Sequence, residues 1–147
     1  MKFLYFDLKY AIKAHDKVLE ISGGVSGIKD VGLLESVVEH VKNDDYYPTL
    51  AAKLTHIVFS VAMNHAFVDG NKRSAIALSA FFLGINGYDK RVGIFIVEME
   101  NIVLGVVEKK ISKSFLLETI DSLVEYGELT EEIKLKLFSA LENRKNL

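Results

Sequence analysis

Apolar residues recur at helical spacing along nearly the whole chain, and only one of its 147 residues is a proline. From Asp7 to Ile21, apolar side chains stand three and four residues apart, which places them on one face of a helix. The same spacing follows Asp30, a residue type that suits the N-cap of a second helix. The pattern predicts an all-α fold in which any extended pieces are small.

The residues that interrupt this periodicity predict where the other helices begin and end. Glycines break the pattern at residues 22–27, and a polar, turn-like stretch covers residues 43–47. Five further helices are expected, at residues 50–64, 72–86, 99–109, 114–126 and 130–144. The β-branched segment 92–97 fits either a short strand or the start of a helix.

Composition limits the classes of protein to which the chain can belong. Its length suits one domain, and the absence of cysteine excludes disulfides, thiol nucleophiles and cysteine zinc sites. Eighteen basic and twenty acidic residues give a net charge of -2, so direct nucleic-acid binding is not expected. The longest uncharged stretches, 55–68 and 74–88, are too short to span a membrane, and residues 1–17 do not resemble a signal peptide. A cytoplasmic location is therefore expected.

The segment from His65 to Arg73 is unusually rich in reactive side chains and lies between two apolar helices. It holds an imidazole, a carboxylate, an amide, an ammonium and a guanidinium within nine residues. Simple connections between helices use mainly Gly, Pro, Asn and Ser. The composition of this segment therefore indicates a functional loop rather than a structural connector.

Four residues of this loop suit the phosphates of a nucleotide. A helix that begins near Asn71 offers free N–H groups and the positive end of its dipole to an anion, and Gly70 allows close approach of the backbone. Lys72 and Arg73 add positive charge, and a guanidinium can bind two phosphate oxygens at once. Asn71 can also hydrogen-bond a phosphate directly.

Three other residues of the loop complete this interpretation. Asp69 can hold a Mg²⁺ ion that bridges the phosphates, because this ion takes few protein ligands beside phosphate oxygens. His65 can take the proton of an attacking hydroxyl, since imidazole is the side chain that changes charge near neutral pH. Phe67 is expected to anchor the loop in the core.

A family resemblance rests on this segment, which reads HAFVDGNKR from residue 65 to residue 73. It resembles the signature of the Fic/Doc superfamily, most closely that of the Doc (death-on-curing) branch. At about 5% per residue type, a chance match at its seven specified positions occurs about once in a billion start sites, and about ten to a hundred times as often when the allowed alternatives are counted. The resemblance covers residues 19–88 and implies one Fic/Doc-type domain over residues 1–147, with a helical C-terminal part at 96–147.

The resemblance implies a Fic-like helical bundle with a central helix-loop-helix active site, in which a small β-hairpin flap can be present. Members of the superfamily transfer part of a nucleotide, with ATP and Mg²⁺, to a hydroxyl of a target protein. Most members move AMP, whereas Doc-type toxins move the terminal phosphate, act on a translation elongation factor and are inhibited by an antitoxin. The implied roles are general base for His65, Mg²⁺ ligand for Asp69, phosphate ligands for Asn71 and Arg73, and loop anchor for Phe67.

Two positions favour phosphate transfer over AMP transfer within this resemblance. Lys72 stands where many AMP-transferring members have glycine, and Ile76 stands where they have a second arginine. If the triphosphate binds in the reversed direction, its terminal phosphate lies in line with the hydroxyl that His65 activates. Gly70, by contrast, replaces the alanine of Doc-like members and points toward the other branches.

Two other functions stay open from the sequence alone. One is a non-catalytic module that binds a nucleotide or a partner, and the other is a metal-dependent phosphodiesterase that uses His65 and Asp69. A zinc site is not expected, because neither a thiol nor a suitably spaced second histidine supports it. The remaining histidines, at positions 15, 40 and 56, are expected to be surface or hydrogen-bonded core residues.

Inhibition is expected to come from a separate antitoxin chain, with a glutamate in the pocket around Arg73. Many Fic proteins carry an inhibitory helix with Ser or Thr, three residues, Glu, and then Gly or Asn. The nearest match here, residues 139–143, is one residue short, which turns Glu142 about 100° away on a helix. Self-inhibition by this glutamate is the less favoured alternative.

Two loops carry further expectations. The glycines at positions 23, 24 and 27 are expected to form a structural turn, since no strand precedes them and no Gly-Lys-Ser/Thr sequence follows. The polar stretch 43–47 is expected to be a solvated loop or, by the family resemblance, a flap that docks the backbone of the target.

Overall fold

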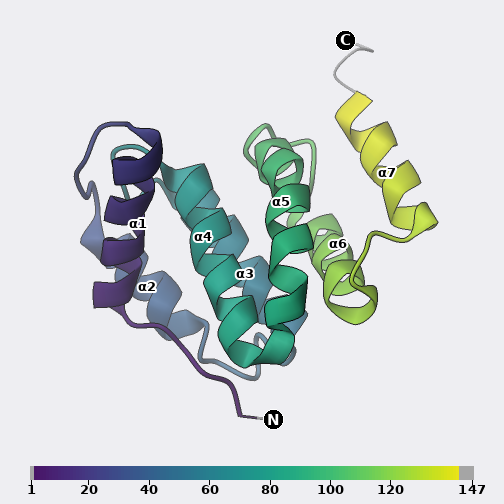
Figure 1. Ribbon diagram of the computed structural model, residues 1–147, viewed down its shortest axis with the longest axis horizontal. Helices are drawn as coiled ribbons and strands as arrows, with labels where there is room; N and C mark the ends of the chain where they lie inside the picture. The colour runs from purple at the N-terminus through teal and green to yellow at the C-terminus, as the bar shows by residue number, and fades with distance from the viewer. Residues whose placement is uncertain (1, 143–147) are drawn as a thin grey trace.

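The computed structural model describes residues 2–142, which form a bundle of helices joined by short loops (Figure 1). A short π-helical turn, Gly84–Tyr88, and a 3-10 turn, Asp89–Arg91, connect the fourth helix to the fifth. The α-helices are α1 (Leu8–Ser22), α2 (Val31–His40), α3 (Leu50–Asn64), α4 (Asn71–Leu83), α5 (Val92–Val107), α6 (Lys113–Tyr126) and α7 (Glu131–Glu142). Residues 2–142 form no strand, so the all-α prediction is confirmed.

Five of the helices begin after a polar residue that caps them. The capping side chains each accept a hydrogen bond from the backbone N–H three residues further along the chain, and they are Asp7, Asp30, Thr49, Ser112 and Thr130. Such bonds satisfy N–H groups that have no partner inside the helix, which explains why these residues fix the boundaries. The expected cap at Asp30 is among them.

The ambiguous segment 92–97 is helical and forms the first part of α5. This helix therefore begins at Val92 rather than at the predicted Met99. Phe95 and Met99 lie four residues apart and are both buried, so the segment buries one face at helical spacing. The expected continuation of α7 from Glu142 to residue 144 lies outside the described residues.

Helices α3 and α4 form the centre of the molecule. Helix α3 packs against α2, α4, α5 and α6, and α4 packs against α1, α3 and α5. Figure 1 shows α1 and α2 on one side of this pair, α5 and α6 on the other, and α7 at the outer edge. The loop between the two central helices is therefore held by elements on several sides.

No helix within residues 2–142 has the length and apolar character required to cross a bilayer.

A buried lysine ties the N-terminal segment and the loop after α2 to the start of α3. Lys53 is 0% exposed, and its Nζ donates to the carbonyl oxygen of Val41 at 2.7 Å and pairs with Asp44 at 2.8 Å. The rings of Phe3 and Tyr5 lie 5.1 and 5.5 Å from the same ammonium. A buried charge needs such partners to offset its lost hydration, so these contacts fix both segments.

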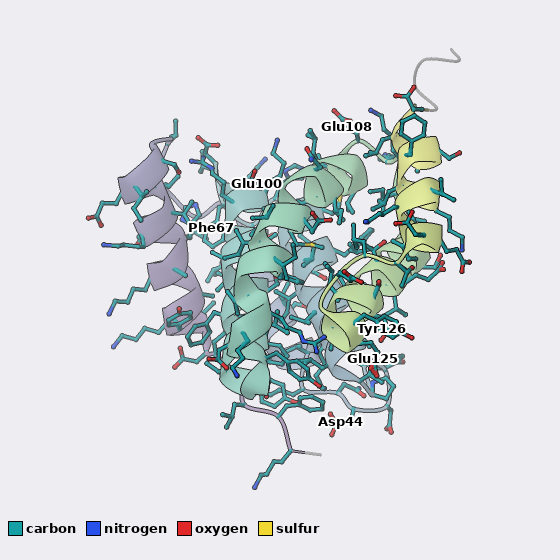
Figure 2. The ribbon with its side chains drawn as sticks, turned by 45° about the vertical axis from the view of Figure 1, so that its right-hand side comes forward. Asp44, Phe67, Glu100, Glu108, Glu125 and Tyr126 are labelled. Carbon is teal, nitrogen blue, oxygen red and sulfur yellow. The ribbon has the colours of Figure 1, made fainter. Side chains whose placement is uncertain are left out.

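This arrangement places the polar stretch 43–47 far from the reactive loop. Helix α3 separates the two, and its 15 residues span about 22 Å. Figure 2 shows Asp44 at the bottom of the bundle and Phe67 in its upper half. Residues 43–47 form turns rather than a hairpin, so their position supports the solvated-loop interpretation and not a flap over the site.

A second buried ionisable group, His56, lies in the interior next to this stretch. The side chain is 5% exposed, and its Nε2–H donates to the carbonyl oxygen of Val37 at 3.2 Å. Its ring stacks on that of Tyr47 with the centroids 4.4 Å apart. Burial, reinforced by the positive charges of Lys113 and His40, lowers the pKa of His56 to about 4.

The low pKa of His56 predicts a loss of stability in mild acid. An unfolded histidine titrates near pH 6.5. The contribution of neutral, buried His56 to the free energy of unfolding is therefore complete above that pH and is lost as the pH falls toward 4. We expect the free energy of unfolding, measured with urea, to fall by up to about 3 kcal/mol over this window. The free energy of unfolding of a His56→Gln variant, whose residue 56 cannot titrate, should fall less over the same pH window. Equal losses in the two proteins would contradict the prediction.

Candidate functional site

A left-handed residue stands at each end of the loop between α3 and α4. His65 ends α3 with φ 54° and ψ 43°, and Gly70 precedes α4 with φ 78° and ψ 19°. This backbone conformation is easy for glycine and unfavourable for histidine. An unfavourable conformation persists only where the surrounding structure enforces it, so the packing of the loop determines where His65 lies.

Asn71 closes the loop through two hydrogen bonds to the backbone of Phe67. Its Oδ1 accepts from the Phe67 N–H at 3.1 Å, and its Nδ2 donates to the Phe67 carbonyl oxygen at 3.0 Å. The side-chain amide is therefore used to hold the loop. The phosphate-binding role expected for Asn71 stays a prediction, and its backbone lies in the first turn of α4.

Phe67 lies beneath the loop, where it packs against His15 of α1. Phe67 is 1% exposed, and its ring stacks on the imidazole of His15 with the centroids 3.6 Å apart and the planes 2° apart. His15 is equally buried, and its Nε2–H donates to the carbonyl oxygen of Asp69 at 2.6 Å. His15 is thus a hydrogen-bonded core residue that supports the site from below.

The glycine-rich segment between α1 and α2, residues 23–30, lies directly against the loop. The N–H of Val68 donates to the carbonyl oxygen of Gly27 at 3.1 Å, and the N–H of Lys29 donates to that of Ala66 at 2.7 Å. Ile28 and Phe67 form an isolated antiparallel β-bridge at the same place. The glycines form a turn as expected, but the turn is also a wall of the site.

The same segment contacts the two side chains of opposite charge in the loop. Oδ2 of Asp69 accepts from the N–H of Val25 at 3.0 Å. Nη1 of Arg73 donates to the carbonyl oxygen of Gly23 at 2.9 Å and to the hydroxyl of Ser22. Nη2 of Arg73 lies 3.7 Å from Oδ1 of Asp69, so the segment and the ion pair form one connected network.

A cavity of about 380 Å³ opens over the loop. This volume lies within the range of about 300–1,000 Å³ that is usual for small-molecule sites. Its walls are formed by Ala62, His65, Val68, Asp69, Gly70, Asn71, Lys72, Arg73 and Val107. The candidate residues of the loop therefore face one shared space, apart from Phe67, which is buried beneath it.

Asp69 fits the requirements of a Mg²⁺ ligand in this cavity. Hydrogen bonds from the N–H groups of Val25 and Gly70, together with the charge of Arg73, hold the pKa of its carboxyl below the usual value. The side chain is 44% exposed, so it is ionised and accessible. Because Mg²⁺ is commonly held by one or two carboxylates together with substrate phosphates, this donor set suits a magnesium–nucleotide complex.

Sequence reasoning missed the contribution of α1 and of the glycine-rich segment to the site. A signal for His15 was present, since it stands between Ala11 and Leu19 at helical spacing on the buried face of α1. No local signal marks the contacts of Val25 or Ser22 with the loop, because they join residues far apart in the chain.

Comparisons with known proteins concern both the loop and its surroundings. A family model described as "Fic/DOC family" matches residues 5–83. "Toxin Doc" of Mycolicibacterium smegmatis is 45% identical over 69 residues, which cover 44% of this chain and 53% of that protein. "Protein kinase doc" of Escherichia phage P1 is 30% identical over 121 residues, which cover 79% of this chain and 90% of that protein. The chain thus spans about half of the first relative and most of the second.

The contact between the glycine-rich segment and the loop predicts unequal effects of two alanine substitutions. Gly23 and Gly24 both have positive φ, but a Cβ at Gly23 meets nothing within 4 Å, whereas one at Gly24 would lie 2.7 Å from Oδ2 of Asp69. We expect Gly24→Ala to lower the free energy of unfolding by at least about 1 kcal/mol more than Gly23→Ala does. Urea unfolding measures both, and equal effects would show that the segment does not pack on Asp69.

Proposed function

Because this chain belongs to the Fic/DOC family, we propose that it is a Doc-like toxin that transfers the terminal phosphate of ATP to a hydroxyl of a target protein. The single observation that carries the proposal is the shared cavity over the loop, which is faced by a histidine, a carboxylate and two cationic side chains. These are the groups that phosphoryl transfer requires for proton removal, metal binding and charge stabilisation. The resemblance of the chain to the Doc branch is confirmed by the relatives named above.

His65 is the proposed general base. Its side chain is exposed at the cavity, where it can accept a proton from an incoming hydroxyl. As the target oxygen forms a bond with the terminal phosphorus, the bond from that phosphorus to the bridging oxygen breaks. The nucleoside diphosphate leaves, and the hydroxyl proton remains on the imidazole.

The first turn of α4 is the proposed binding site for the phosphates. Gly70 is the N-cap residue of this helix and makes no side-chain hydrogen bond to its terminal N–H groups, which suits the binding of an anion there. Lys72 and Arg73 flank the cavity and add two positive charges. A bound phosphate would replace the carbonyl oxygen of Gly23 as a partner of Arg73. Mg²⁺ held by Asp69 would neutralise part of the phosphate charge.

Phosphate transfer is favoured over AMP transfer by two residues of α4. Lys72 brings an ammonium to the cavity where glycine would leave open space, and Ile76 offers no charge where a second arginine would bind another phosphate. The alternatives are AMP transfer to a protein hydroxyl and a non-catalytic nucleotide-binding or partner-binding module. The proposed target, a translation elongation factor, rests on the family resemblance.

We also propose that a separate antitoxin inhibits the protein. A groove of about 680 Å³ lies along α1, with apolar walls formed by Tyr10, Ala14, Val18, Ile21 and Ala77. Such a groove suits the apolar face of an amphipathic helix. The groove reaches Ile21, and the next residue, Ser22, contacts Arg73. A glutamate of the bound antitoxin can therefore approach the guanidinium of Arg73.

Transfer of isotope from labelled ATP tests the proposed reaction. We expect label from the γ-phosphate, and not from the α-phosphate, to appear on a protein of a bacterial extract. His65→Ala should reduce this transfer at least about 100-fold, because the general base is lost. The matched control is His40→Ala, since His40 is an exposed histidine at the end of α2 and does not line the cavity over the loop.

The other outcomes assign the alternatives. Transfer of α-label alone would indicate AMP transfer, and hydrolysis of ATP without a labelled acceptor would indicate a phosphodiesterase. Nucleotide binding with neither reaction, together with cell toxicity that His65→Ala leaves unchanged, would indicate a non-catalytic module. Each of these results contradicts the proposed kinase.

A further inference from the structure

The peptide group between Asp69 and Gly70 is held at both of its polar ends. Its carbonyl oxygen accepts from the Nε2–H of His15 at 2.6 Å, and its N–H donates to Oδ1 of Asp69 at 2.8 Å. One end of this peptide group therefore contacts the buried face of α1. The other end contacts the carboxylate that is the proposed ligand of Mg²⁺.

The imidazole of His15 is itself held in one position. The side chain is 1% exposed, and its ring is parallel to that of Phe67 with the centroids 3.6 Å apart. Its second nitrogen, Nδ1, lies 3.6 Å from Oδ1 of Asp16 on the same helix. A carbonyl oxygen only accepts, so Nε2 carries the hydrogen of the bond to Asp69. The donor therefore has a fixed place and a fixed direction.

The backbone at this point has a second arrangement open to it. Gly70 has φ 78°, and glycine adopts positive and negative φ about equally well. The peptide group that precedes it can therefore flip with little steric resistance, as ψ of Asp69 and φ of Gly70 change together. A flip would exchange the two ends of the peptide group. The carboxylate of Asp69 would then lose a donor and meet an acceptor, so it would leave its present position.

His15 has no contact with the space in which a ligand would bind. Among the described residues, Asp69 and Gly70 line the cavity over the loop and His15 does not. Its burial also makes the ring inaccessible to a ligand. Any effect of His15 on ligand binding must therefore pass through the loop above it, by way of the peptide group or of Phe67.

We propose that His15 is a positioning residue for metal binding by Asp69. Its hydrogen bond keeps the peptide group between Asp69 and Gly70 in one orientation, and this orientation keeps the carboxylate in place at the cavity. The inference rests on the proposed function, because it assumes that Asp69 binds Mg²⁺ together with a nucleotide. It adds that a residue of α1 sets the affinity for the metal without touching it.

Two substitutions of His15 separate its donor from its ring. His15→Phe keeps an aromatic ring against Phe67 but has no donor, whereas His15→Gln keeps a donor at the place of Nε2 but has no ring. With a non-hydrolysable ATP analogue present, we expect His15→Phe to weaken binding of Mn²⁺, used in place of Mg²⁺, about tenfold. His15→Gln should restore the affinity to within about threefold of wild type. Electron paramagnetic resonance, which detects free Mn²⁺, measures both.

His56→Phe is the matched control for these variants. His56 is also a buried histidine, its Nε2–H also donates to a backbone carbonyl oxygen, and its ring also stacks on an aromatic side chain. It is not among the residues that line the cavity over the loop. We expect His56→Phe to bind Mn²⁺ as the wild-type protein does, at a temperature at which melting curves show that every variant is folded.

The dependence of phosphate transfer on Mg²⁺ provides a kinetic test. We expect His15→Phe to raise the Mg²⁺ concentration for half-maximal transfer about tenfold, because the metal ligand is displaced. At saturating Mg²⁺ the rate should return to within about threefold of wild type, since His15 takes no part in the reaction itself. A loss of rate that Mg²⁺ does not restore would contradict a role in metal binding.

Hydrogen exchange of the Gly70 amide tests the backbone without any ligand. In His15→Phe the flip is no longer opposed, so we expect this amide to exchange at least about tenfold faster than in wild type. The N–H of Ser74, which donates to the carbonyl oxygen of Gly70 at 2.9 Å in the first turns of α4, should exchange at an unchanged rate. Faster exchange at both positions would indicate general loosening instead and would contradict the proposal.

The remaining outcomes separate this inference from the proposed function. The inference alone is overturned if wild type and His15→Phe bind Mn²⁺ equally well, or if His56→Phe weakens binding as much as His15→Phe does. If the wild-type protein binds no Mn²⁺ with the analogue, the proposed function fails together with the inference. Weak binding by His15→Phe, with near-normal binding by His15→Gln and His56→Phe, supports both.

Discussion

The paired hydrogen bonds between the side chain of Asn71 and the backbone of Phe67 hold the reactive loop in one shape. They close five residues into a compact turn and bring the first turn of α4 beside the end of α3. The stack of Phe67 on His15 then fixes the turn to the core. With the backbone held in this way, His65 keeps its left-handed conformation and faces the same cavity as Asp69 and Arg73.

The charges of the site are balanced by the protein itself. The carboxylate of Asp69 and the guanidinium of Arg73 form hydrogen bonds with the glycine-rich segment and lie close to each other. In the proposed function, a magnesium–nucleotide complex would bring both charge types to these two side chains. This concentration of charge in one loop is compatible with a chain whose formal net charge is only -2.

The features that could be predicted from the sequence are those set by neighbouring residues. Helix periods, N-caps and the nine-residue loop depend on short spacings, and the helical fold agrees with them. The segment 92–97 stayed ambiguous because β-branched residues suit both strands and buried helices. The contact of His15 with Asp69 joins residues 54 positions apart, and no local pattern specifies it. The placement of residues 43–47 was likewise decided by the length of α3 and the buried Lys53.

The direction of the bound nucleotide is tested most directly by a crystal structure of the protein with Mg²⁺ and a non-hydrolysable ATP analogue. We expect the terminal phosphate nearest His65 and the phosphate chain along the first turn of α4. An α-phosphate nearest His65 would contradict the proposed transfer of the terminal phosphate.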